Sequence, residues 1–290
     1  MRKYVAMKVV VTGANGQLGK CLQDVAKQFP TLECIFLGRE HCDLQQFGMV
    51  TQVLHSLQPD WVINAAAYTA VDKAEQEAAA ARLINGEAVG HLAKVCKDVG
   101  AKLLHVSTDY VFDGTATTPY VETDTVHPIG IYGESKLMGE QLAQEVYAAG
   151  TAIIRTSWVY SRHGANFVKT MLRLMKEREA IGVVKDQLGS PTHAIDLAKA
   201  LLTICEHPQF VPGIFHYSNS GIISWYNFAV AIQEISGLNC TVNPITTADF
   251  PTPAKRPAWS VMDCSKIERT YSIPLMEWQT SLQHCLRQLL

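Results

Sequence analysis

Residues 8–19 read Lys8-Val9-Val10-Val11-Thr12-Gly13-Ala14-Asn15-Gly16-Gln17-Leu18-Gly19, a β-branched run that passes directly into a glycine turn and then into a helical pattern. The G-x-x-G-x-x-G spacing permits positive φ in the turn and lets backbone N–H groups approach a ligand. The start of a helix attracts anions, so this strand, turn and helix predict a pyrophosphate-binding site for a dinucleotide. The alternative is that the three glycines serve only as a tight connection.

The first half of the chain continues the same alternation of short β-branched runs and longer helical patterns. Such alternation is typical of βαβ units and of a parallel sheet covered on both faces. The sequence therefore predicts an α/β protein with a Rossmann-type doubly wound parallel sheet. Apolar spacing predicts strands at 8–12, 33–37, 61–64, 102–107 and 151–156, and helices at 18–27, 47–57, 74–99 and 133–147.

After about Arg155 the pattern becomes less regular, and prolines interrupt it repeatedly between Pro191 and Pro274. We expect residues 1–155 to form the dinucleotide-binding Rossmann domain and residues 156–290 to form mainly a smaller, C-terminal substrate-binding lobe. Residues 194–206 still have helical spacing. A return segment near 194–216 is therefore expected to pack back on the sheet.

Composition narrows the functional class. The chain has 290 residues, 48% hydrophobic and 18% charged, and a net charge of −2 without a basic block, so we expect neither nucleic acid nor a membrane surface as partner. The eight cysteines form no C-x-x-C pair, which predicts reduced thiols and a cytoplasmic protein. Met1-Arg2-Lys3 and the short apolar stretch after it resemble the start of a signal peptide, but they run into the glycine turn without a cleavage site and are interpreted as a first β-strand. No apolar run is long enough to span a membrane.

Residues after the second predicted strand bear on the choice of cofactor. An NAD-preferring site usually has an acidic residue there, but this strand ends Leu37-Gly38-Arg39. Arg39 suits a 2′-phosphate, so NADPH is predicted, with NADH also accepted; the alternative for Arg39 is a solvated surface charge. Asp43 and Leu44 are candidates for the adenine, although Asp43 also fits a helix N-cap. Ala65-Ala66-Ala67 would let the backbone pass close to the cofactor, or simply pack on a helix.

Tyr132 and Lys136 are four residues apart on one predicted helix face, within reach of one ligand. A nearby Lys⁺ favours the phenolate and is expected to bring proton transfer closer to working pH. Alone, this spacing would indicate a surface ion pair. Thr108 ends a predicted strand, where ligands of open α/β sheets bind, and its hydroxyl could bond a substrate oxygen beside Tyr132. A turn hydroxyl is the alternative for Thr108.

Several longer motifs resemble the extended short-chain dehydrogenase/reductase family, over nearly the whole chain. They are Asn64-Ala65-Ala66-Ala67-Tyr68-Thr69-Ala70-Val71-Asp72-Lys73-Ala74-Glu75, Ser107-Thr108-Asp109-Tyr110-Val111-Phe112-Asp113-Gly114, Arg155-Thr156-Ser157-Trp158-Val159-Tyr160, Asp186-Gln187-Leu188-Gly189-Ser190-Pro191-Thr192 and Pro251-Thr252-Pro253-Ala254-Lys255-Arg256-Pro257. The resemblance is to nucleotide-sugar reductases. It implies NAD(P)H-dependent reduction of the C4 keto group of dTDP-4-dehydro-6-deoxy-L-mannose to dTDP-L-rhamnose, the last step of dTDP-L-rhamnose synthesis.

The resemblance also implies roles for single residues. It assigns Thr108, Tyr132 and Lys136 to catalysis, and Val71, Thr108, Asp109 and Trp158 to the substrate. Because anionic oxygens need amide and guanidinium donors, we add Asn166, Gln187 and Arg256 for the nucleotide-diphosphate end, with a structural ion pair as the alternative for Arg256. The residues expected at the cofactor are Gly13, Asn15, Gly16, Gln17, Leu18, Gly19, Arg39, Asp43, Leu44, Ala65, Ala66, Ala67, Tyr132 and Lys136.

Two rival functions share these features. A nucleotide-sugar dehydratase or epimerase would have the same Tyr/Lys pair, but the dehydratases resemble Thr-Asp-Glu at the strand end, where this chain has Tyr110. A non-catalytic regulatory subunit, such as the β subunit of methionine adenosyltransferase, resembles the same group. No metal site is predicted, because neither carboxylates nor histidines show ligand spacing. The oligomeric state is open, with a homodimer as one outcome.

Overall fold

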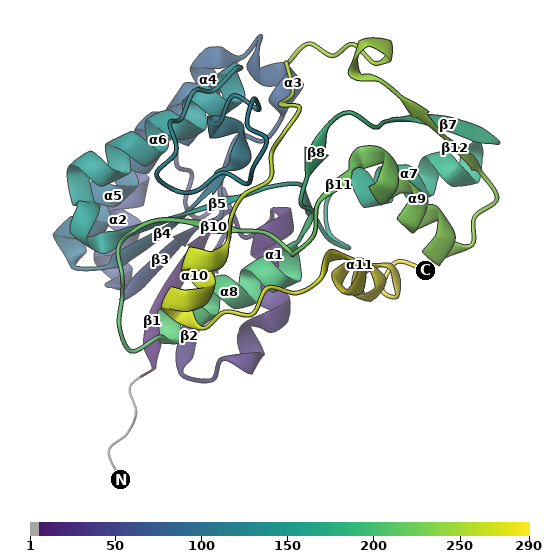
Figure 1. Ribbon diagram of the computed structural model, residues 1–290. Helices are drawn as coiled ribbons and strands as arrows, with labels where there is room; N and C mark the ends of the chain where they lie inside the picture. The colour runs from purple at the N-terminus through teal and green to yellow at the C-terminus, as the bar shows by residue number, and fades with distance from the viewer. Residues whose placement is uncertain (1–5) are drawn as a thin grey trace.

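The computed structural model describes residues 6–290 (Figure 1). Residues 1–5, which we interpreted as part of a first β-strand, lie outside the described residues. The centre of the structure is a six-stranded sheet with all strands parallel, in the order β10-β5-β4-β3-β1-β2. The strands are β1 Met7–Thr12, β2 Leu32–Leu37, β3 Trp61–Asn64, β4 Lys102–Thr108, β5 Thr151–Thr156 and β10 Gly213–Tyr217. The predicted doubly wound parallel sheet is confirmed.

Helices cover both faces of this sheet (Figure 1). One face packs on α1 Gln17–Val25, α8 Ala194–Glu206 and α10 Ser265–Tyr271, and the other on α2 Phe47–Leu57, α5 Ala88–Val99 and α6 Ile131–Tyr147. Val9, Val10 and Val11 are completely buried, since alternate side chains of β1 enter opposite cores. This explains why the central strands are continuous apolar runs rather than alternating ones.

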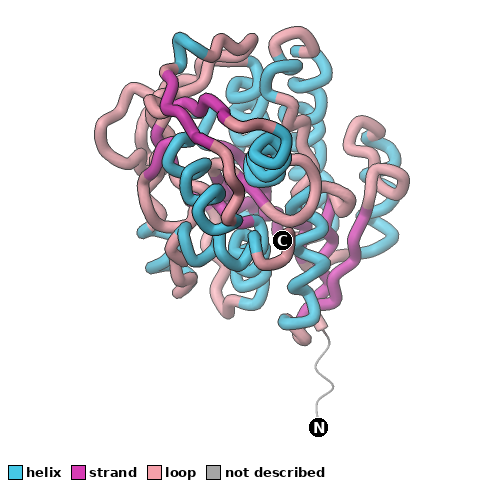
Figure 2. Tube along the Cα trace, turned by 90° about the vertical axis from the view of Figure 1, so that its right-hand side faces the viewer, coloured by secondary structure: helices cyan, strands magenta, loops and turns pink. Residues whose placement is uncertain are grey.

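The chain beyond β5 builds a second, smaller core beside the sheet. It comprises α7 Phe167–Glu177, α9 Trp225–Ser236 and α11 Trp278–Leu286 with the parallel pair β7 Ala180–Val184 and β12 Thr241–Ile245. Two short pairs adjoin it, β6 Val159–Tyr160 with β9 Thr192–His193 and β8 Leu188–Gly189 with β11 Ile223–Ser224. Figure 2 views the molecule from this side, where the chain ends. The segment through α8 and β10 returns to the main sheet.

The predicted helix over 74–99 is wrong as a single element. The chain forms the short α3 Val71–Ala74 and is then interrupted at residues 75–77. From Ala78 it is helical throughout, as α4 Ala78–Arg82, a π-helical turn Leu83–Glu87 and α5. The wider turn presents the Asn85 side chain, which accepts from Tyr68 N at 2.9 Å and donates to Ser135 Oγ at 3.1 Å. Apolar spacing could not reveal the π-helical turn, because Asn85 makes these hydrogen bonds with a neighbouring loop and with α6.

Smaller differences concern element ends. The helix predicted from residue 133 begins at Ile131, and the helix predicted to residue 27 ends at Val25 and continues as a 3₁₀ turn. None of the helices within residues 6–290 combines the length and the apolar character that crossing a bilayer would require.

Candidate active site

A cavity of about 810 Å³ lies where β1, β3, β4 and β5 end. The second lobe closes it through Trp158, Asn166 and Trp225. The carboxyl edge of an open parallel sheet, beside the point where strand order reverses between β1 and β3, is the usual ligand position in such folds.

Most of the residues singled out from the sequence meet in this cavity. Its lining includes Gly13, Asn15, Gly16, Gln17, Leu18, Arg39, Ala65, Ala66, Ala67, Val71, Thr108, Asp109, Tyr132, Lys136, Trp158 and Asn166. Gly19, Asp43, Leu44, Gln187 and Arg256 lie outside the lining. Residues up to 149 positions apart, such as Gln17 and Asn166, are brought into hydrogen-bond contact there.

The three glycines of the first turn are needed for different structural reasons. Gly13 has φ +71, and a Cβ on it would lie 2.6 Å from the backbone N of Ala66. A Cβ on Gly19 would lie 2.3 Å from the carbonyl oxygen of Gly13. Both are therefore required by packing. Gly16 has only that carbonyl nearby, at 3.2 Å, and among residues 6–290 no side chain caps α1 at this position. Gly16 thus leaves the amides of the helix start accessible from the cavity.

Arg39 lies at the rim of the cavity with a side chain that is 73% exposed. Its Nε donates to Asp43 Oδ2 at 3.1 Å. Asp43 also accepts from Gln45 N, but α2 begins at Phe47 with Gln46 before it. The interpretation of Asp43 as the N-cap is therefore wrong, because the carboxylate closes a turn ahead of the helix and holds Arg39 instead.

Tyr132 and Lys136 lie one turn apart at the start of α6, and Thr108 ends β4 opposite them. Burial raises the pKa of Tyr132 to about 12, and the adjacent Thr108 hydroxyl offsets part of that rise. The phenol therefore keeps its proton at neutral pH. The ring packs edge-on against Tyr110, with centroids 5.5 Å apart.

The expectation that Lys136 would favour the phenolate of Tyr132 is wrong in this structure, because burial dominates the pKa of both groups. The Nζ of Lys136 donates to Val106 O at 2.6 Å and lies 3.4 Å from His105 Nε2. Burial lowers the pKa of Lys136 to about 8, against the opposing effect of Glu140. A buried lysine with such a pKa is suited to taking up and releasing a proton.

Asp109 supplies an acceptor facing the same cavity. Its Oδ1 accepts from Thr108 Oγ1 at 2.9 Å, whereas its Oδ2 is buried without a hydrogen-bond partner among residues 6–290. Burial raises the pKa of Asp109 to about 6. Ser107 Oγ, which the sequence analysis gave no role, is likewise buried without a partner in the described chain. Such unpartnered atoms would gain a bond from the hydroxyls of a bound ligand.

An aromatic stack that the sequence analysis missed forms another wall. Trp158 has φ +48, a left-handed conformation that is unusual for a tryptophan, and its ring stacks on Trp225 with centroids 3.5 Å apart. Trp225 begins α9, 67 positions further along the chain by sequence numbering, so no local pattern could have paired the two. The stack offers a flat apolar surface to a ring-shaped ligand.

Three polar candidates have partners within the protein. Asn166 donates to Gln17 Oε1 at 2.8 Å and caps α7 through Lys169 N. Gln187 donates to Thr247 Oγ1 at 3.1 Å, away from the cavity. Arg256 pairs with Asp72 at 2.9 Å, which is the structural ion pair that we kept as its alternative.

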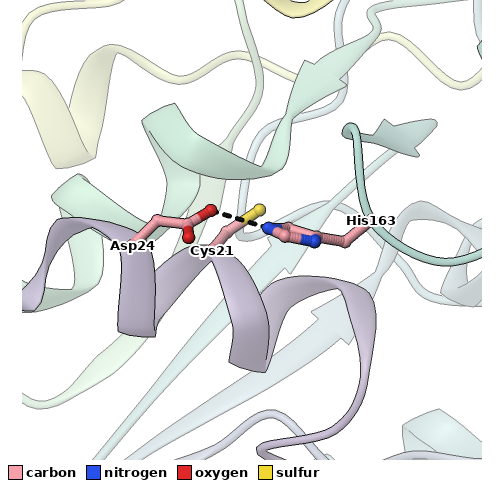
Figure 3. A group of neighbouring side chains, drawn as sticks. All are labelled: Cys21, Asp24 and His163. Carbon is pink, nitrogen blue, oxygen red and sulfur yellow. Dashed lines mark hydrogen bonds and ion pairs between the residues drawn. The ribbon is translucent and has the colours of Figure 1, made fainter. Parts of the chain in front are cut away.

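A group with metal-ligand chemistry occurs outside the cavity (Figure 3), at residues that no spacing in the sequence had singled out. Cys21, Asp24 and His163 place ligand atoms within 4.8 Å of one another. Asp24 accepts from Arg162 at 2.8 Å and contacts His163 Nε2 at 2.7 Å, and burial raises the pKa of Cys21 to about 11. These ion pairs tie α1 to the loop before α7.

The doubly wound sheet, the glycine turn and the Tyr/Lys pair at the carboxyl edge together define an oxidoreductase of the short-chain dehydrogenase/reductase type. Comparison with known proteins narrows the class further. The chain belongs to the family described as RmlD substrate binding domain, whose family model matches residues 7–290.

Similar proteins agree in length as well as in sequence. A dTDP-4-dehydrorhamnose reductase of Sinorhizobium fredii is 43% identical over 293 residues, covering 98% of each chain. The crystal structure of a dTDP-4-dehydrorhamnose reductase from Clostridium acetobutylicum has a TM-score of 0.93 at 40% identity, covering 98% of this chain and 99% of that one. The enzyme of the same name from Bacillus anthracis, solved in complex with NADP, has a TM-score of 0.93 at 37% identity, covering 98% and 100%.

Proposed function

We propose that this protein reduces the C4 keto group of dTDP-4-dehydro-6-deoxy-L-mannose to dTDP-L-rhamnose with NADPH, as the last step of dTDP-L-rhamnose synthesis. The observation that carries the proposal is the convergence of Thr108, Tyr132 and Lys136 on the cavity that also receives the glycine turn. Full-length relatives that bear the name dTDP-4-dehydrorhamnose reductase support it.

The cavity fits a dinucleotide cofactor. The open amides near Gly16 would hold the pyrophosphate, and the small side chains of 65–67 would let the cofactor pass close to the backbone. When bound, NADPH supplies the hydride for C4. Arg39, exposed at the rim, would hold the 2′-phosphate while Asp43 keeps its guanidinium in place. NADH lacks that phosphate, so we expect it to be accepted less well.

Tyr132 is the proton donor in this mechanism. Its high pKa keeps the phenol protonated until negative charge develops on the oxygen at C4, which then takes the phenolic proton. Thr108 holds that oxygen once its hydroxyl turns its one hydrogen from Asp109 Oδ1 to the substrate. Asp109 accepts from a sugar hydroxyl through its unpartnered oxygen. Lys136, one helix turn away, restores the proton of Tyr132. Catalysis is mainly orientation and charge stabilisation.

The nucleotide sugar is proposed to lie against the Trp158 and Trp225 stack and to contact Val71, which lines the same cavity. Asn166 lines this end of the cavity, but its amide already has protein partners. For Gln187 and Arg256 we propose only indirect roles, since both engage other protein groups outside the lining.

A spectrophotometric assay tests the proposal: loss of absorbance at the reduced-nicotinamide band, with dTDP-4-dehydro-6-deoxy-L-mannose added and NADPH and NADH compared in parallel. Oxidation of NADPH supports it. Tyr132→Phe is expected to bind NADPH normally and to lose at least a hundredfold in turnover, a typical effect of removing one proton donor. Near-normal turnover in that variant would contradict the assignment of Tyr132.

The same assay separates the rival functions. A dehydratase or epimerase would retain its nicotinamide through each turnover, and Tyr110 stands where a dehydratase would need a glutamate. A regulatory subunit would bind the cofactor without oxidising it. The hydroxyl of Thr108 and the phenol of Tyr132, which adjoin in a ligand-sized cavity, favour an enzyme over a regulatory subunit.

The proposal also covers the cellular location and the oligomeric state of the protein. A cytoplasmic location is supported by free thiols at all eight cysteines in the part of the chain that the structure describes. Light scattering of the purified protein would give the oligomeric state. A homodimer is one outcome.

A further inference from the structure

A chain of buried polar side chains runs across three neighbouring strands to Lys136. Thr12, at the end of β1, donates from Oγ1 to Asn64 Oδ1 at 2.7 Å, and Asn64, at the end of β3, lies 3.1 Å through Nδ2 from His105 Nδ1. The other ring nitrogen of His105 lies 3.4 Å from Lys136 Nζ. Thr12, Asn64 and His105 are all completely buried. The chain therefore connects the strand before the glycine turn with the proposed proton-transfer pair.

The donors and acceptors around Asn64 and His105 determine how these two side chains are oriented. Ala66 N, a donor only, donates to Asn64 Oδ1 at 3.2 Å, so the Asn64 amide cannot be rotated to face it with Nδ2. The Nδ2 group must then donate to His105 Nδ1. Burial lowers the pKa of His105 well below its ordinary value, so the ring is neutral and carries its one hydrogen on Nε2. That hydrogen faces Lys136.

An N–H group directed at Lys136 cannot accept a bond from an ammonium. It repels the charged form of Lys136 and leaves Val106 O as the buried acceptor for it. Within the described residues, Glu140, one turn along α6, acts on the charge of Lys136, and Tyr132 lies one turn before it. Glu140 favours the ammonium, but its carboxylate is engaged by Arg155 of β5. His105 is thus the neighbour on β4 that opposes the charge.

We propose that His105 is a positioning residue that weakens the hold of Lys136 on its proton, and that Asn64 enforces this by locking the ring in the Nε2–H tautomer. The inference rests on the proposed function for its catalytic consequence. In each reduction, Tyr132 loses its O–H proton to the substrate oxygen, an N–H proton of Lys136 passes to the resulting phenolate, and Lys136 regains one from solvent. A weakly held proton on Lys136 makes the second transfer favourable.

The tautomer is measured directly by NMR on ¹⁵N-histidine-labelled protein, with the resonance of His105 assigned by its loss in His105→Gln. We expect the hydrogen on Nε2 and an unprotonated Nδ1. A hydrogen on Nδ1, or a doubly protonated ring at neutral pH, would overturn the inference. This measurement uses the unaltered protein, so it does not depend on any variant folding.

The effect on Lys136 is measured by two variants that reverse the dipole. Asn64→Asp offers a carboxylate to His105 Nδ1, which moves the hydrogen there and turns an Nε2 lone pair towards Lys136. His105→Gln can turn a carbonyl oxygen towards it. In both, the alkaline limb of the pH profile of turnover is expected to rise by about one pH unit. His91→Gln is the matched control, because His91 lies in α5 and is not one of the polar side chains that connect Thr12 to Lys136. It should leave the alkaline limb of the pH profile in place.

The inference is wrong if both folded variants keep the alkaline limb of the unaltered protein. A purely structural role for His105 would lower stability without moving that limb. If the protein does not oxidise NADPH with the nucleotide sugar, the proposed function is wrong but the inference on His105 is not yet tested. Titration of the Lys136 side chain by ¹³C NMR then tests that inference. Its midpoint is expected near the pKa of about 8 and higher in Asn64→Asp; an unmoved midpoint would again overturn it.

Discussion

Glu140→Gln tests how the core supports the site. Glu140 of α6 and Arg155 of β5 form a buried ion pair, each with a side chain that is only 2% exposed. Arg155 Nε lies 3.0 and 3.1 Å from the two carboxylate oxygens, and Nη2 lies 2.6 Å from one of them. The guanidinium also lies 5.1 Å from the ring centre of Phe112. Replacing the carboxylate with an amide leaves this cation buried with no countercharge.

The expected loss follows from that burial. Breaking a buried ion pair on one side costs about 3–5 kcal/mol, because the remaining charge stays desolvated. A domain has roughly 5–15 kcal/mol of total stability, so the variant should unfold at much lower urea concentration. Urea denaturation followed by circular dichroism measures the change.

The matched control removes both charges at once. The double variant Glu140→Leu with Arg155→Met should recover most of the loss, since no unpaired charge remains. A change below about 1 kcal/mol for Glu140→Gln, in the range of an exposed pair, would refute the reasoning. Glu140 also raises the pKa of Lys136, so in the folded variant the alkaline limb of turnover should move down, opposite in sign to His105→Gln.

Three further predictions concern the cofactor and pH. Gly13→Ala should weaken NADPH binding at least tenfold in a fluorescence titration, because φ is +71 and the added Cβ would lie 2.6 Å from Ala66 N; unchanged affinity would show that the turn can relax. Arg39→Gln should reduce the preference for NADPH over NADH by about tenfold in KM, the effect of losing about 1.4 kcal/mol, whereas an unchanged ratio would leave Arg39 a solvated charge. Turnover should fall as pH rises through about 8, because Lys136 loses its proton there. It should also fall as pH decreases through about 6, because Asp109 gains a proton there. A flat pH profile of turnover between about pH 5 and 9 would contradict both assignments.

Features that depend on neighbouring residues could be read from the sequence. The β-branched run before Gly13, its glycine spacing and the alternation of strands and helices predict the doubly wound sheet, and the strand ends at Thr108 and the helix pair Tyr132 and Lys136 predict which residues share its edge. The strand register accounts for this agreement. β1 and β3 end together at Thr12 and Asn64, and β4 and β5 end together at Thr108 and Thr156, all at the carboxyl edge of the sheet. The family resemblance added the substrate, which local patterns do not encode.

Other features depend on residues far apart in the chain, and only the tertiary structure decided them. The π-helical turn before α5, the Trp158 and Trp225 stack, and the partners of Gln187 and Arg256 all involve contacts across elements. Burial, which spacing does not measure, reversed the expected effect on the proton affinity of Tyr132.

The first turn and the Tyr/Lys pair thus follow from the sequence by itself, because glycine conformation and helix periodicity act over a few residues. The chain from Thr12 through Asn64 and His105 to Lys136 does not, because its members come from three strands and a helix that become neighbours only through the order of the sheet. Which nitrogen of His105 holds the hydrogen depends on a single backbone N–H at Ala66, and that geometry exists only in the folded protein.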